Sequence, residues 1–288
     1  MVLRVFLCLY YVAAAAGLLT VCGQTAWALE AQDGRDESTL TAELIVERAL
    51  DRAAKQDESY VELGFESRGE SRIESINGDG VVTKTETTGY LRYALEGLLY
   101  DELVEKNGMV LSDDEAREEQ ERKAKFIREV QSHAVRGEEY MPNDMDVGFD
   151  RELMERYKTN LAGNELVRGH LCWVIEFEPR DGRLPDNRRM DKALNRSTGR
   201  LWISQEDYGV VRVAFEMQRP FRYLWGLVAT LRHADGRFDF ERIAQNFWAP
   251  VAFDLTLDLR VLFRGIHRHI LQRWTDYNGP GLNDSSAP

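Results

Sequence analysis

A long alternation of apolar residues near the C-terminus constrains the fold more than any other part of the sequence. Every second residue from Val251 to Phe263 is apolar, and most residues between them are polar, in the segment VAFDLTLDLRVLF. A period of two residues places alternate side chains on opposite faces of a β-strand. The segment therefore predicts a long strand that buries one face and leaves the other face to water.

Other segments repeat this period. Residues 163–182 and 199–217 place large apolar side chains on one face, and residues 60–77 and 80–95 alternate in the same way from Tyr60 onward. Turn signals separate the strands: NGDG at 77–80, EDYG at 206–209 and HADGR at 233–237, each read as a hairpin or turn. Successive strands without intervening helices favour an antiparallel meander.

Two segments have helical spacing instead. Residues 40–55 carry an apolar stripe. Residues 112–135 begin with Ser112, and Glu115 follows three residues later, which is the pattern of a capping box at the start of a helix. The stripe of the first helix comprises Leu40, Leu44, Ile45, Ala49 and Ala53, and that of the second comprises Phe126, Ile127, Val130 and Ala134. The first half of the second helix is highly charged, so we expect it to be solvated, and we assign it no ligand.

The net charge of the chain disfavours some kinds of binding partner. The 288 residues contain 49 Asp and Glu against 37 Lys and Arg, a formal net charge of −12. This acidic balance argues against nucleic acid or an anionic membrane surface as the main partner.

The N-terminus has the features of an export signal. Arg4 precedes the apolar run at 5–21, and Ala26-Trp27-Ala28 fits a cleavage site with small residues. We expect residues 1–28 to be a signal peptide and the protein to be periplasmic. Two alternatives remain: acylation of Cys22 as an outer-membrane lipoprotein, since LTVC loosely resembles a lipobox, or an uncleaved anchor.

The remaining chain is predicted to form one domain. Residues 29–38 are a polar linker, 39–278 the domain and 279–288 a flexible tail. We find no internal repeat and no Pro/Gly/Ser-rich linker between domains.

No constellation in the sequence points to catalysis. The nucleophile-elbow, metalloprotease, P-loop and dinucleotide motifs are missing, and we predict no enzyme, cofactor or metal site. His267 and His269 share one face of a predicted strand, but Arg264 and Arg268 beside them disfavour a cation. Cys172 is interpreted as a packing residue. Asp254 and Asp258, about 13 Å apart along a strand, are interpreted as part of a solvated outer face.

Six or more predicted strands have one apolar face each, and these faces together form a large apolar surface that must be covered. Only two helices are predicted that could cover it. A strongly curved antiparallel sheet, a half-barrel closed by helices in a mainly β (α+β) protein, solves this and can leave a cavity. Such a cavity suits a lipid, because an acyl chain of about 14 carbons costs about 11 kcal/mol to expose to water.

Residues 158–277 resemble the periplasmic lipoprotein-carrier (LolA/LolB-like) superfamily, and within it the outer-membrane lipoprotein-sorting-like proteins. The matching segments are G-x-E-x-V-x-G at 163–169, FEP at 177–179, and NR…GRLWI…ED at 195–207. The resemblance implies a half-barrel whose apolar interior holds the acyl chains of a lipid or lipoprotein, with an envelope membrane or protein as a further partner. It transfers no catalytic residue.

The candidate ligand-binding residues are apolar and aromatic side chains on these strands and on the segment PFRYLWGLVATL at 220–231. They are Phe221, Tyr223, Leu224, Trp225, Leu227, Val228, Trp173 and Phe215. Two interpretations of the 220–231 segment stay open: the rim of a cavity, or core packing. The basic segment 180–196 could face a headgroup or partner, but its interleaved Asp181, Asp186 and Asp191 favour a solvated loop and helix. The alternative function is a protein-binding envelope module or sensor with a filled core.

Overall fold

The computed structural model describes residues 4–5, 40–62, 64–138, 140, 147–186, 190–223, 229–244, 247–262 and 264–279. The predicted linker lies outside these residues. The predicted leader and tail also lie outside them, except for Arg4, Val5 and Gly279.

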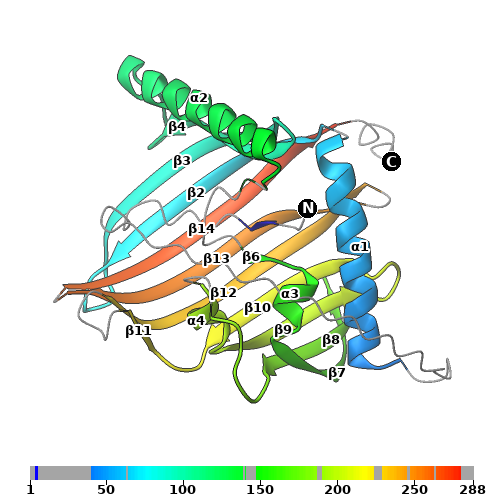
Figure 1. Ribbon diagram of the computed structural model, residues 1–288. Coiled ribbons are helices and arrows are strands. Elements are labelled where there is room, and N and C mark those ends of the chain that lie inside the picture. Colours follow the sequence, from blue (N-terminus) through cyan, green and yellow to red (C-terminus); the bar gives the residue numbers. More distant parts are fainter. Residues whose placement is uncertain are drawn as a thin grey trace.

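A strongly curved antiparallel sheet of 12 strands dominates the molecule (Figure 1). Its path in space is β5-β4-β3-β2-β14-β13-β12-β10-β9-β8-β7, and β11 pairs with β12. The strands are β2 (Glu66–Ile76), β3 (Val82–Leu95), β4 (Leu98–Lys106), β5 (Met109–Val110), β7 (Tyr157–Val167), β8 (His170–Pro179), β9 (Ser197–Ser204), β10 (Val210–Met217), β11 (Phe221–Tyr223), β12 (Ala229–Ala244), β13 (Phe247–Val261) and β14 (Arg264–Asn278). The sheet is two meanders joined by pairing of the last strand, β14, with the first long one, β2. It stays open between β5 and β7, so the predicted class, a curved antiparallel sheet that forms a half-barrel, is confirmed.

Four helices and a small two-stranded sheet accompany the main sheet in the described ranges. The helices are α1 (Ala42–Glu62), α2 (Asp113–Arg136), α3 (Arg151–Met154) and α4 (Asp191–Leu194), and β1 (Arg4–Val5) pairs with β6 (Val147–Gly148). The predicted capping box begins α2: Ser112 accepts from the Glu115 backbone, and the Glu115 side chain accepts from the Ser112 backbone.

The two long helices pack on opposite faces of the sheet. Ile45, Val46 and Ala49 of α1 join Ile175 and Leu201 in one buried cluster, and this face is called the inner face below. By contrast, α2 packs against Tyr100 of β4, whose cross-strand partner is Tyr93, on the outer face. Part of the inner face is therefore covered by α1 and by the short helix α3, whose Met154 joins the same cluster.

Several local predictions are wrong. The HADGR segment is no hairpin, because β12 runs through it without interruption from Ala229 to Ala244. The alternation from Tyr60 does not begin a strand either: α1 continues to Glu62, and the chain turns at Gly64, whose φ of +64° suits glycine.

The predicted helix stripes also differ in part. Leu40 and Leu44 are exposed near the start of α1, as is Ala134 near the end of α2. In the charged half of α2, which was expected to be solvated, Glu119 is buried and accepts a hydrogen bond of 2.8 Å from the Tyr100 hydroxyl. The helix is therefore held along more of its length than its apolar residues indicate.

Candidate functional site

One row of directly paired residues crosses the inner face of the sheet from β8 to β2. The row is Ile175, Leu201, Val213, Phe238, Phe253, Gln272 and Ser71. Its first five members are apolar and its last two are polar. The inner face is therefore amphipathic, and along this row the change from apolar to polar side chains falls between β13 and β14.

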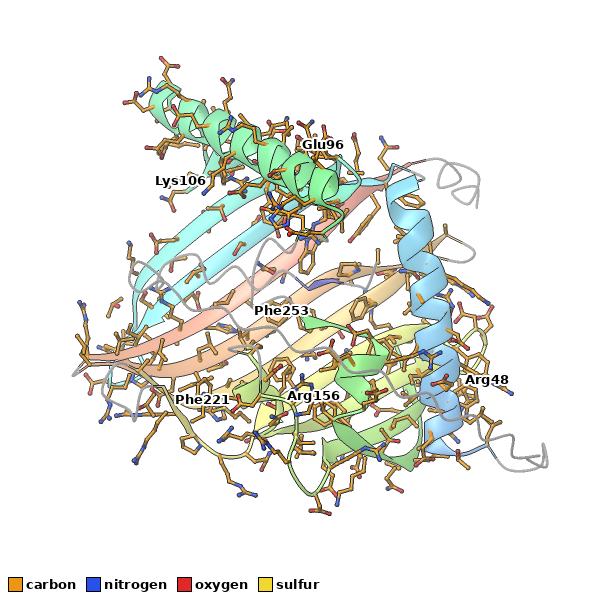
Figure 2. All side chains as sticks on the ribbon, in the orientation of Figure 1. Arg48, Glu96, Lys106, Arg156, Phe221 and Phe253 are labelled. Atoms are coloured by element: carbon orange, nitrogen blue, oxygen red, sulfur yellow. The ribbon has the colours of Figure 1, made fainter. Side chains whose placement is uncertain are left out.

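Aromatic packing builds the apolar part of this face. The rings of Phe238 and Phe253 stack with centroids 4.0 Å apart and an interplanar angle of 15°. Leu255 of β13 and its partner Ile270 of β14 extend the same surface and are buried. Figure 2 shows Phe253 in the middle of the sheet, away from the two long helices.

Two glycines let aromatic rings approach the backbone of this surface closely. A Cβ atom on Gly236 of β12 would lie 2.6 Å from the Phe215 ring, and one on Gly199 of β9 would lie 2.5 Å from the Phe177 ring. These glycines are therefore required by close packing rather than by a turn.

The polar part lies on β2 and β14. Ser67, Ser71, Gln272 and Trp274 are all at least nine-tenths buried. Beside them, Arg92 of β3 binds Asp101 of β4 through two hydrogen bonds of 2.7 and 2.8 Å, and its guanidinium lies 5.2 Å from the centre of the Trp274 ring. Polar side chains are thus concentrated at these positions of β2, β14 and β3, next to the apolar part of the face.

Several polar contacts hold α1 across the ends of the strands. Gln56 bonds to the backbone of Trp248, and Arg52 forms an ion pair of 2.8 Å with Asp207. Arg48, which is nearer the N-terminal end of α1 and is labelled in Figure 2, donates a hydrogen bond to the Tyr208 hydroxyl. The Asp207 carboxyl is partly desolvated, but hydrogen bonds from Trp248 and Gly209 and the charge of Arg52 keep its pKa below the usual value.

The predicted ligand-binding residues are distributed over two regions. Trp173 stacks on Tyr208 with ring centroids 5.1 Å apart, beside the cluster under α1. Phe215 packs against both this cluster and the one containing Phe253, and half-buried Phe221 packs against the latter. Tyr223 ends β11. Leu224, Trp225, Leu227 and Val228 lie outside the described residues. The structure thus brings Trp173, Phe215 and Phe221 to the two inner clusters, and their binding role stays a prediction.

A groove of about 1010 Å³ lies on the opposite side of β7–β13. Its wall carries both signs of charge, from Lys158, Glu176, Arg200, Arg237 and Asp254 among others. Because an acyl chain gains nothing from such surroundings, this groove is not the predicted lipid cavity.

The paired histidines lie on the outer face with carboxylate partners. His269 Nε2 is 2.8 Å from Asp254 and its Nδ1 is 3.2 Å from Glu74, while His267 is 3.5 Å from Asp258. Burial would lower the pKa of His269, but the hydrogen bonds to Asp254 and Glu74 outweigh it and raise the pKa. The two aspartates therefore lie on the outer face, as predicted, and each faces a histidine.

Other reactive side chains serve packing. Cys172 is fully buried, and burial raises the pKa of its thiol to about 11, which disfavours the thiolate nucleophile. Within the described ranges, no group of three or more His, Cys, Asp or Glu could hold a metal ion.

Asp191 was expected in a solvated loop and helix, but it is buried 2.9 Å from Arg156. Figure 2 labels Arg156 close to α3.

No helix in the described parts of the chain has the length and apolar composition needed to cross a membrane.

Comparisons with known proteins give structural matches only. No protein-family model and no curated protein matches the chain. The structural matches include a LolA superfamily protein from Nitrosomonas europaea, at 12% identity and a TM-score of 0.31, over 85% of this chain and 96% of that one. A domain assigned to outer membrane lipoprotein sorting from Vibrio parahaemolyticus gives 14% identity and a TM-score of 0.31, over 84% and 95%. A DUF1329 family protein from Desulfovibrio piger gives 13% and 0.29, over 84% and 95%. These matches include a protein of the superfamily that the sequence resembles.

Sequence reasoning missed the polar part of the inner face. Ser67 and Ser71 alternate with charged residues in a segment that looks polar throughout. Gln272 and Trp274 are two residues apart on β14 and therefore lie on the same face of that strand. This spacing was the one sequence signal for the polar part of the inner face.

Proposed function

We propose that the protein binds the acyl chains of a lipid or lipoprotein against the apolar part of its inner face and carries or holds them in the cell envelope. The observation that carries this proposal is the buried apolar surface that Phe238, Phe253, Leu255 and Ile270 form on the inner face. Burial of one methylene group contributes about 0.8 kcal/mol, so such a surface can hold a long chain without any chemical step. The function is non-enzymatic. The envelope location rests on the N-terminal leader, and mass spectrometry of the mature N-terminus tests it.

A filled-core module is the second candidate. Phe253 and Leu255 are only 2% and 1% exposed, so the inner face already excludes water at these positions. This observation favours a protein-binding envelope module or sensor whose interior is occupied by its own chain.

One substitution separates the two candidates. Leu257 of β13 lies on the inner face between its partners Ala234 and Arg268 and is 8% exposed. Under the carrier function, Leu257→Gln weakens binding of the neutral fluorescent probe N-phenyl-1-naphthylamine about tenfold and keeps the fold. Under the filled-core function, wild-type protein binds no probe and the substitution lowers the unfolding temperature instead.

Leu262→Gln is the matched control, because Leu262 is 58% exposed in the turn between β13 and β14. Lipid extraction of protein purified from the envelope completes the test. Repeated absence of any bound lipid, together with no binding of the probe, contradicts the carrier function.

A further inference from the structure

Four side chains on β2 and β14 form a polar patch on the inner face: Ser67, Ser71, Gln272 and Trp274. Each is 2–4% exposed. Within the described part of the chain, the two serine Oγ atoms, Gln272 Oε1 and Trp274 Nε1 make no hydrogen bond. Because a buried polar atom without a partner destabilises a protein by about 1–3 kcal/mol, four of them on one surface require an explanation.

The register of the strands makes these four residues neighbours. Gln272 is directly opposite Ser71, and Trp274 is directly opposite Gly69, the residue midway between the two serines. The Tyr90 ring lies over Gly69, where a Cβ atom would come within 2.0 Å of it. The four residues are therefore neighbours on two strands, with the Tyr90 ring of β3 packed between the two serine positions, and they adjoin Phe253, the partner of Gln272 on β13.

The chemistry of the patch is neutral. A tryptophan Nε1 can only donate, an amide oxygen can only accept, and a serine hydroxyl does both. The adjacent cation, Arg92, is bound in a bidentate pair by Asp101. A ligand that satisfies the patch therefore needs acceptor oxygens and a hydroxyl donor, and it needs no net charge.

We propose that the polar patch binds the ester and hydroxyl groups of a neutral acylglycerol whose chain lies along the apolar part of the inner face. This proposal rests on the proposed acyl-chain binding and names its ligand class. A free fatty acid fits less well, because its carboxylate would be buried beside a guanidinium already bound to Asp101.

Displacement of N-phenyl-1-naphthylamine from the full chain in detergent-free buffer tests the ligand class. We expect 1-monolauroylglycerol to displace the probe at a concentration about tenfold lower than laurate does, because it makes two or more additional hydrogen bonds. Equal displacement by the two lipids overturns the proposal. If the wild-type protein binds neither the probe nor either lipid, the proposed function itself fails.

Substitutions in the patch test which residues bind the polar groups. Ser71→Ala and Trp274→Phe each remove one polar atom, Gln272→Met removes the amide oxygen and nitrogen, and all three keep much of the side-chain shape. We expect each to weaken monolauroylglycerol binding about three- to tenfold and to leave probe binding unchanged. Thr87→Ala on the outer-face side of β3 is the control and leaves both affinities unchanged. Unchanged monolauroylglycerol binding in all three patch variants overturns the proposal.

Stability provides a readout that a merely structural role would not give. Since Gln272→Met removes an acceptor without a partner, the free variant unfolds at a higher temperature than the wild type while it binds acylglycerol more weakly. A variant that unfolds at a lower temperature and keeps its acylglycerol affinity shows that Gln272 supports the fold, and this result contradicts the assignment.

Discussion

Gln56 of α1 makes two hydrogen bonds to the backbone of Trp248 at the start of β13. Its Nε2 donates to the Trp248 carbonyl oxygen at 2.6 Å, and its Oε1 accepts from the Trp248 N–H at 2.8 Å. The amide thus pairs with the strand as the backbone of a neighbouring strand would. This contact fixes the far end of the helix that covers part of the inner face.

The substitution Gln56→Leu removes both hydrogen bonds and leaves the Trp248 N–H and carbonyl in a buried position. We expect a loss of about 2 kcal/mol in the free energy of unfolding. We also expect faster amide exchange along α1, measured by hydrogen–deuterium exchange. Gln131→Leu on the exposed surface of α2 is the control. Slow exchange along α1 in the Gln56 variant would show that its apolar contacts alone hold the helix.

Arg156 and Asp191 form a fully buried ion pair, each with a side chain 1% exposed and with 2.9 Å between them. The guanidinium also donates to the Pro185 carbonyl and to Asn195. Removing one partner of a buried pair costs about 3–5 kcal/mol, so we expect Arg156→Met to lower the free energy of unfolding by this amount in urea titrations.

Arg200→Met provides the comparison for the buried pair. Arg200 contacts Glu176 at 2.8 Å, but the two side chains are 55% and 43% exposed. An exposed pair contributes at most about 1 kcal/mol. Equal losses in the two variants would contradict the importance of the burial of Arg156.

Gly199 of β9 leaves no room for a side chain. A Cβ atom at this position would lie 2.1 Å from the carbonyl oxygen of Ala214, a backbone atom that cannot rotate away. We expect Gly199→Ala to destabilise the protein by about 1–3 kcal/mol in thermal or urea unfolding. Gly78→Ala in an open turn is the control, since its Cβ would meet no atom within 4 Å. A neutral Gly199 variant would show that the two strands can separate locally.

Local patterns predicted much of this fold because they depend on neighbours in the sequence. The alternation from Val251 became β13, and Ser112 with Glu115 became the cap of α2. The HADGR prediction was wrong because Gly236 is used for packing under Phe215 rather than for a turn. A glycine near an aspartate looks the same in the sequence in both situations.

The polar patch could not be predicted, because it depends on which strands are neighbours. Alternation shows that Gln272 and Trp274 share a face of their strand. It does not show that this strand pairs with the strand of Ser67 and Ser71, which lie more than 200 residues earlier in the chain. In the same way, Asp191 looked solvated in the sequence because its partner Arg156 comes from a distant segment.

His269 should make stability depend on pH in a window above the ordinary histidine pKa of about 6.5. Its hydrogen bonds to Asp254 and Glu74 raise its pKa, so the folded protein binds the proton more tightly than the unfolded chain does. The resulting stabilisation is complete below the unfolded pKa and is lost as pH rises through the folded pKa. We therefore expect the free energy of unfolding to fall as pH rises above the ordinary histidine pKa, measured by urea titration. His269→Gln should remove most of this decline, whereas His267→Gln, two residues away on β14, should keep it. Parallel curves for wild type and His269→Gln would contradict a stabilising role of the imidazolium, because both neighbouring carboxylates would then be held equally well by a neutral side chain.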